Sequence, residues 1–129
     1  MTGRAPADIV PCMNNAASCI FCRIASGEIP SRRVHEDAEI VAFEDVNPQA
    51  PVHVLVVPRA HIPTLNDLDP TTAALAGRIV MVGREVAHKK GLGERGYRLV
   101  WNCLEEAGQS VFHLHLHVLG GRPMGWPPG

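Results

Sequence analysis

Hydrophobic and polar positions along the chain form seven segments whose periodicity predicts two helices and five strands. The predicted strands are 33–36, 40–44, 53–58, 98–102 and 110–119. The first two flank a polar turn at 37–39, as expected of a hairpin. Segment 53–58 is almost continuously apolar, which predicts a strand that is buried on both faces.

The two predicted helices differ in length. Residues 19–25 place three apolar side chains within one turn, with Ser18 as the expected N-cap and Gly27 as the stop. A longer helix is expected to begin at 69–70, where aspartate precedes proline, and to end before Gly91. Its apolar face recurs at Leu75, Ile79, Val82 and Val86. The order of helix, strands, long helix and strands predicts an α+β fold with an antiparallel sheet.

The composition fits one globular domain: the 129 residues are 46% hydrophobic and 19% charged. We expect residues 1–17 to form a flexible N-terminal extension and residues 18–129 to form the domain. The net charge is −1 and no basic block stands out, which argues against nucleic acid as a partner. Apolar runs are shorter than the ~20 residues of a membrane span. Residues 1–17 also lack the apolar centre of a secretory signal, so we expect a cytoplasmic protein without a membrane partner.

Three histidines alternate with apolar residues near the end of the chain. On strand 110–119, His113, His115 and His117 would face one way and the intervening apolar side chains would face the core. The backbones of the outer two would lie ~13 Å apart, whereas two nitrogen ligands of one zinc ion lie within roughly 4 Å of each other. Two of these imidazoles could share a metal, but three could not without strong distortion. A nucleophile between two helpers fits the spacing better.

A histidine nucleophile points to chemistry at phosphorus. Imidazole attacks a phosphoryl centre and forms a phosphoramidate, which water later cleaves. Neighbouring imidazoles can donate hydrogen bonds to the phosphate oxygens and protonate the leaving group. Residues 108–110 combine a glycine, backbone N–H groups and a hydroxyl, which suits an anion cradle just before the histidines.

Segment 113–119, His-Leu-His-Leu-His-Val-Leu, resembles the signature of the histidine-triad (HIT) superfamily. Further segments resemble its Hint branch, the nucleoside phosphoramidases: 47–51, 57–61, 108–113 and the tail 120–129. The resemblance spans about 19–129. It implies a HIT-like fold with a five-stranded antiparallel sheet and two helices, and a homodimer whose sheets join edge to edge.

The resemblance also implies catalytic roles. His115 matches the nucleophile, and His117 matches the residue that contacts the phosphate and the leaving group. His113 and His53 match histidines that support and orient the site. No cofactor is implied for catalysis itself.

A second set of residues matches the family's nucleotide-binding positions. They are Ile20, Phe21, Ile24, Phe43, Asp45, Val46, Asn102, Gly108, Ser110 and Trp126. Asp45 would hold the ribose hydroxyls, and the apolar members before Asn102 would surround the base. Trp126, in the tail, would reach the partner's site in the dimer and set the preference for leaving groups.

Cys19 and Cys22 form a Cys-x-x-C motif, which by itself fits a metal site, a redox pair or simple packing. Together with His61 and His113, the motif resembles the structural zinc site of some bacterial HIT proteins. A Cys₂His₂ set suits tetrahedral zinc, whereas other Hint proteins lack these cysteines. A structural zinc and buried apolar cysteines both stay open as interpretations.

The resemblance predicts an enzyme that hydrolyses AMP conjugates with amines or acyl groups, such as AMP-lysine or aminoacyl-adenylates, through a nucleotidyl-histidine. Its partner would be a purine nucleotide. Residues 103–107 and Gly125 depart from the pattern of the branch, and both departures bear on the leaving group. Two alternatives remain: a dinucleoside polyphosphate hydrolase, and a nucleotide-binding regulatory or scaffold protein.

Overall fold

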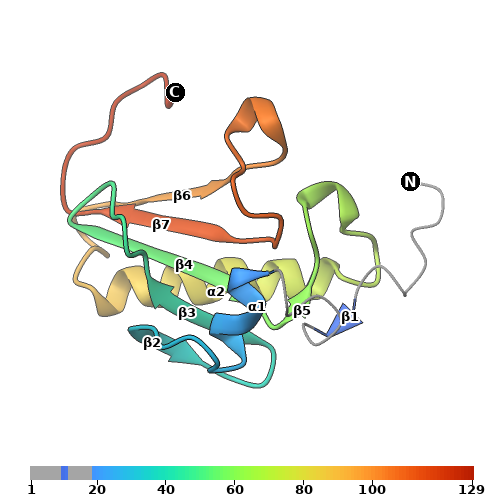
Figure 1. The fold of residues 1–129 in the computed structure, drawn as a ribbon. Helices are drawn as coiled ribbons and strands as arrows, with labels where there is room; N and C mark the ends of the chain where they lie inside the picture. Colours follow the sequence, from blue (N-terminus) through green and yellow to red (C-terminus); the bar gives the residue numbers. More distant parts are fainter. Residues whose placement is uncertain (1–9, 12–18) are drawn as a thin grey trace.

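The structure, a computed structural model, describes residues 10–11 and 19–129. It has an α+β fold in which a five-stranded antiparallel sheet has one helix on each face (Figure 1). The strand order is β2-β3-β4-β7-β6. The elements are α1 (Ile20–Ala25), β2 (Arg33–Glu36), β3 (Ile40–Glu44), β4 (Val52–Pro58), α2 (Ala73–Lys89), β6 (Arg98–Trp101) and β7 (Leu116–Gly120). The predicted fold class is therefore confirmed.

Strand β4 occupies the centre of the sheet and is buried from His53 to Pro58, as its apolar sequence predicts. It pairs with β3 on one side and with β7 on the other, where His53 lies opposite Leu119 and Leu55 lies opposite His117. The register makes His53 on β4 and His117 on β7 diagonal neighbours on the same face of the sheet. This juxtaposition is not local in the sequence.

The two faces of the sheet bury separate cores. The core under α2 includes Ile79, Val82 and Val86 from the helix and Leu114, Leu116 and Val118 from the segment with the histidines. The core under α1 includes Phe21, Ile24, Phe43 and Leu55. The predicted apolar faces of the long helix and of the histidine segment are both confirmed.

The last strand is shorter than predicted: β7 begins at Leu116, not at residue 110. Its neighbour β6 ends at Trp101, which lies opposite Leu116, so residues 110–115 have no β6 partner with which to continue the ladder. Their polar groups bond elsewhere; for example, Leu114 N–H donates to Ile62 O at 2.6 Å. Strand β6 likewise stops one residue before the predicted end.

The expected start of the long helix at 69–70 is also wrong. Asp69 instead caps a turn, in which its Oδ1 accepts hydrogen bonds from Thr71 N–H and Thr72 N–H, and α2 begins at Ala73. The helix ends at Lys89, and Gly91 follows with a φ of +81°, as a helix stop requires. Cys19 is the N-cap of α1; the predicted cap, Ser18, lies outside the described residues.

Smaller elements complete the fold. Strand β1 (Val10–Pro11) pairs antiparallel with β5 (Ala60–His61), and the described residues also form the short 3₁₀ helices η3 (Leu65–Asp67) and η4 (Glu105–Ala107). The remainder of the predicted extension 1–17 lies outside the described residues, and the domain boundary at residue 18 stays a prediction. Among the helices that are described, none has the length and apolarity to cross a membrane.

Candidate active site

His115 is held so that its outer nitrogen carries a lone pair. Its Nδ1 lies 2.7 Å from the main-chain oxygen of His113. A carbonyl oxygen only accepts hydrogen bonds, so Nδ1 carries the proton and Nε2 does not. Burial lowers the pKa of the His115 imidazole below its ordinary 6.5, which keeps the ring neutral at pH 7. The buried Phe21 ring lies against it, with the two centroids 5.0 Å apart.

The ring of His117 is oriented by a chain of hydrogen bonds that begins at Gln49. Gln49 N–H donates to His53 Nδ1 at 3.0 Å, so the proton of the neutral His53 ring lies on Nε2. That nitrogen donates to His117 Nδ1 at 2.9 Å, and the carboxylate oxygen Asp45 Oδ2 lies 3.4 Å away. The proton of neutral His117 therefore lies on Nε2.

Burial is the largest cause of the lowered pKa of His53. It is also the largest cause that lowers the pKa of His117, to about 4, so both rings are neutral at pH 7. Asn102 Nδ2 lies 3.5 Å from His117 Nε2, and because an amide nitrogen only donates, it does not accept the Nε2 proton. The Nε2 proton of His117 is therefore available to a bound ligand. The site thus pairs a nucleophilic nitrogen on His115 with a proton donor on His117, and the two ring centroids lie 5.0 Å apart.

The side chain of His113 belongs to a second cluster. Its Nε2 donates to Pro58 O at 2.7 Å, which leaves a lone pair on Nδ1. That atom lies 3.3 Å from Cys19 Sγ and 3.5 Å from Cys22 Sγ, and Cys22 Sγ lies 3.2 Å from His61 Nδ1. Mainly through burial, the pKa of His61 is lowered and that of His113 falls to about 4. Neutral imidazoles and cysteine sulfurs whose ligand atoms converge within 4.8 Å fit a zinc ion.

Asp45, His53 and His117 also place one potential ligand atom each within 4.8 Å of the others. The hydrogen bonds favour a chain of proton donors and acceptors here. A metal on His53 Nε2 would force the ring proton onto Nδ1, where Gln49 N–H already donates. The two clusters therefore differ in chemistry. His115 lies between them, because its Nδ1 donates to the main-chain oxygen of His113 and its ring contacts the ring of His117.

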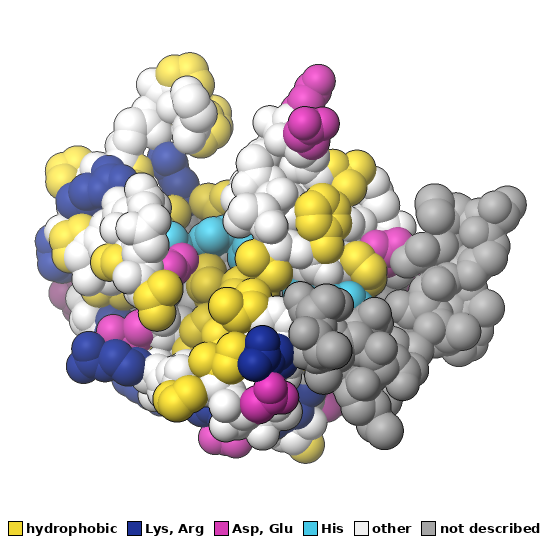
Figure 2. Space-filling model, viewed as in Figure 1, with side chains coloured by type: hydrophobic (Ala, Val, Ile, Leu, Met, Phe, Trp, Pro, Cys, Tyr) yellow, Lys and Arg dark blue, Asp and Glu magenta, His cyan; other side chains and the backbone are white. Residues whose placement is uncertain are grey.

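Several predicted nucleotide-binding residues lie around these rings. Phe21 and Phe43 meet edge to face at 5.5 Å in the core beneath α1, while Ile20 and Val46 are exposed. Figure 2 shows histidine side chains in a hollow of this face, with hydrophobic side chains beside them. The other predicted positions lie in turns or the tail: Asp45, Asn102, Gly108, Ser110 and Trp126. Trp126 is 83% exposed.

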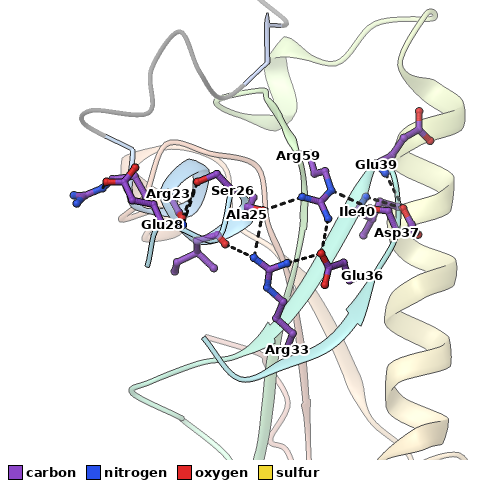
Figure 3. A network of polar contacts seen from close by, with 11 residues as sticks. Arg23, Ala25, Ser26, Glu28, Arg33, Glu36, Asp37, Glu39, Ile40 and Arg59 are labelled. Carbon is purple, nitrogen blue, oxygen red and sulfur yellow. Dashed lines mark hydrogen bonds and ion pairs between the residues drawn. The ribbon is translucent and has the colours of Figure 1, made fainter. Parts of the chain in front are cut away.

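Two arginines hold the helix α1 in place (Figure 3). Arg33 Nη2 donates to Ile24 O at 2.6 Å, and Arg59 Nη1 donates to Ala25 O at 2.8 Å. Both guanidinium groups also contact Glu36 Oε2. The hydrogen bond from Arg33 is the largest cause that lowers the pKa of the Glu36 carboxyl, and the hydrogen bond from Arg59 is the next. A cavity of about 460 Å³ beside this network is lined by none of the histidines, so it is separate from the candidate active site.

Sequence reasoning missed the roles of Gln49, Arg122 and Gln109. The buried Gln109 side chain accepts from Leu104 N–H and donates to the oxygens of Pro63 and Val111, which fastens the loop before the triad. Residues 108–110 are expected to form a turn that cradles an anion, and a glutamine in such a turn gives no signal of this role. Gln49 acts through its main chain, which residue type does not reveal.

Comparison with known proteins agrees with this geometry. Residues 18–125 match the family described as "Scavenger mRNA decapping enzyme C-term binding". An uncharacterized HIT-like protein of Synechocystis sp. is 51% identical over 114 residues, which cover 88% of this chain and 99% of that protein. The purine nucleoside phosphoramidase of Escherichia coli strain K12 is 44% identical over 110 residues, which cover 85% of this chain and 92% of that enzyme.

Solved structures are similar as well. A HIT family hydrolase from Legionella pneumophila Philadelphia 1 superposes with a TM-score of 0.85 at 50% identity, covering 87% of this chain and all of that one. A histidine triad protein from Clostridium difficile gives a TM-score of 0.80 at 44% identity, covering 83% of this chain and 93% of that one. Sequence, fold and triad geometry together show that this chain belongs to the HIT family and is a hydrolase of that family.

Proposed function

We propose that the protein is a purine nucleoside phosphoramidase that hydrolyses AMP conjugates with amines or acyl groups. The observation that carries this proposal is the neutral His115 ring, whose Nδ1–H is bound to the His113 oxygen and whose Nε2 lone pair is free to attack. A relative with 44% identity is named as a purine nucleoside phosphoramidase, which supports the substrate class.

The reaction would take two steps. His115 Nε2 attacks phosphorus and forms the N–P bond while the bond from phosphorus to the leaving nitrogen breaks. The departing amine takes a proton from His117 Nε2, and the positive charge gained by the substituted His115 ring offsets that loss. Water then adds its hydroxyl to phosphorus, breaks the N–P bond and returns a proton to His117. The products are AMP and a free amine.

Asp45 would bind the ribose hydroxyls, and the apolar residues near α1 would enclose the base. Asn102, Gly108 and Ser110 would contact the phosphate. Gly108 has a φ of +84°, which suits glycine and turns the chain toward the triad. An acyl leaving group departs as a carboxylate and needs no proton, so the same site would also cleave acyl-adenylates.

A structural zinc ion would bind Cys19, Cys22, His61 and His113, where it would crosslink α1 to β5 and to the segment just before β7. We also propose a cytoplasmic homodimer. Strands β2 and β6 are the two edges of the sheet, and we place the second copy at β6 because it lies beside β7, the strand that leads into the tail. In such a dimer, Trp126 would border the partner's site.

A panel of AMP conjugates tests the function directly. The panel needs amine, acyl and polyphosphate leaving groups at equal concentration, with release of AMP as the readout. We expect fast release from the amine and acyl conjugates. Faster release from the polyphosphate would favour a dinucleoside polyphosphate hydrolase, and AMP binding without release would favour a regulatory or scaffold protein.

A further inference from the structure

Gln49 joins the C-terminal tail to the histidines through both ends of its main chain. Its N–H donates to His53 Nδ1 at 3.0 Å. Its carbonyl oxygen accepts from Arg122, at 3.0 Å from Nη2 and 3.3 Å from Nε. The same guanidinium also donates from Nη1 to Pro123 O at 3.1 Å. One arginine therefore ties the beginning of the tail to the loop that orients His53.

The tail and this loop also fit closely beside that contact. Gly121 has a φ of +94°, and a Cβ atom built there would lie 2.8 Å from Pro51 Cβ. Glycine is therefore required both by the backbone conformation and by the close approach of the two segments. The next residue, Arg122, is thereby directed at the carbonyl of Gln49. The loop 47–51 contains two prolines, which limit its backbone freedom.

The tautomer of His53 decides which nitrogen of His117 carries a proton. With Gln49 N–H on Nδ1, His53 presents Nε2–H to His117 Nδ1, and His117 keeps its own proton on Nε2. If Gln49 moved away, the His53 proton could shift to Nδ1. His117 would then donate from Nδ1 to His53, and its Nε2 would have no proton for a leaving group.

We propose that Arg122 is a positioning residue for the proton on His117. It acts through the Gln49 main chain and the His53 tautomer, and it makes the tail part of the apparatus that protonates the leaving group. The catalytic consequence of this inference rests on the proposed function. Its structural part, the dependence of the His53 tautomer on Arg122, stands independently.

The test compares Arg122→Ala with Arg98→Ala. Arg98 Nη2 donates to Gly125 O at 2.8 Å, so Arg98→Ala releases the tail at a different point and leaves Gln49 untouched. Nitrogen NMR of ¹⁵N-histidine-labelled protein reports the tautomer of each ring without substrate. We expect the His53 and His117 signals to move toward the other tautomer in Arg122→Ala and to stay in place in Arg98→Ala.

Kinetics then separate positioning from a general structural effect. A charge-assisted hydrogen bond supports an effect of roughly tenfold, so we expect kcat for an AMP–alkylamine conjugate to fall about that much in Arg122→Ala, with KM little changed. An acyl-adenylate, whose leaving group needs no proton, should react at nearly the wild-type rate. Arg122→Lys keeps a donor and should restore part of the amine rate.

Two results would overturn the inference: unchanged histidine tautomers in Arg122→Ala, or equal losses on the amine and acyl conjugates. Arg122 is exposed, and thermal unfolding should confirm that both variants keep the fold. A failure of the proposed function would give a different result: the wild-type protein would release no AMP from either conjugate. The NMR comparison would still test the role of Arg122 in that case.

Discussion

The ring of Phe21 lies 5.0 Å from the ring of His115, centroid to centroid, at an interplanar angle of 84°. Phe21 lies between Cys19 and Cys22 in the chain, so one short helix and its N-cap residue supply both a wall of the candidate active site and two of the candidate metal ligands. A six-residue helix is too short to be stable by itself. Its contacts with the rest of the fold therefore control the shape of the site.

Metal removal should consequently affect nucleotide binding as well as stability. We expect one zinc ion per chain in the wild-type protein, and its loss in Cys19→Ser. The variant should unfold at a lower temperature and bind AMP more weakly, because α1 loses its crosslink to His61 and His113. Elemental analysis, thermal unfolding and calorimetric titration with AMP measure the three effects. Cys103→Ser is the matched control, since Cys103 is not in the cluster. A metal-free wild-type protein with full activity would show that Cys19 and Cys22 serve only as buried packing residues.

His115→Ala should abolish turnover, because the variant lacks the nitrogen that forms the covalent intermediate. AMP binding should remain, since the proposed base and ribose contacts lie elsewhere. Mass spectrometry of a rapidly quenched reaction should locate the nucleotidyl group on His115 in the wild-type protein. His88→Ala controls for loss of an imidazole, as His88 is exposed on α2 and faces Tyr97. Modification of another residue would contradict the assignment.

Asp45→Ala should weaken the affinity for AMP. The Asp45 carboxylate accepts from Asn47 N–H at 2.8 Å through one oxygen and lies near His53 through the other. A charge-assisted hydrogen bond to a ribose hydroxyl is worth ~1.5–3 kcal/mol, or roughly tenfold to a hundredfold in Kd. Equilibrium titration with AMP, with the exposed Glu85→Ala as control, measures the change. An unchanged Kd would show that Asp45 does not bind the ribose.

Gln109→Leu should destabilise the fold and disturb the loop before the triad. The substitution leaves Leu104 N–H and Pro63 O without their side-chain partner, and an unsatisfied buried polar group costs ~1–3 kcal/mol. Denaturant unfolding should show a lower midpoint. The exposed neighbour Glu106→Leu should have little effect by the same measurement. A stable Gln109→Leu protein with normal kinetics would mean that the loop is held by other contacts.

Trp126→Ala should change discrimination between leaving groups while it leaves adenosine binding intact. The side chain is largely exposed in the single chain, as a residue that completes a partner's site would be. One aromatic contact is worth ~0.5–1.5 kcal/mol beyond area burial, so a moderate change is expected. The ratio of kcat/KM for two AMP–amine conjugates measures it, with Phe112→Ala as an exposed aromatic control. A constant ratio in a dimeric protein would exclude a specificity role.

The sequence predicts those parts of the fold that depend on local patterns. The polar turn at 37–39 identifies β2 and β3, a nearly continuous apolar run identifies β4, and helical spacing identifies the apolar face of α2. The start of β7 could not be predicted, because it depends on where β6 ends across the sheet. The start of α2 was missed because an aspartate can cap a turn as well as a helix.

The candidate site divides in the same way. The alternating triad and the Cys-x-x-C motif are visible in the sequence, because each is a local pattern of residue types. The orientation of each ring depends on main-chain atoms of Gln49, Pro58 and His113. Every residue has such atoms, so only the folded chain shows which of them meet a histidine.

The two separate uses of residue 113 bear on how this site can change during evolution. Its imidazole faces the cysteines, whereas the nucleophile depends only on its carbonyl group. A lineage could therefore exchange the side chain at 113 together with both cysteines, and lose this candidate metal site, while inheriting the same presentation of His115. The capacity to hold a metal and the presentation of the His115 ring can thus be inherited separately in this fold.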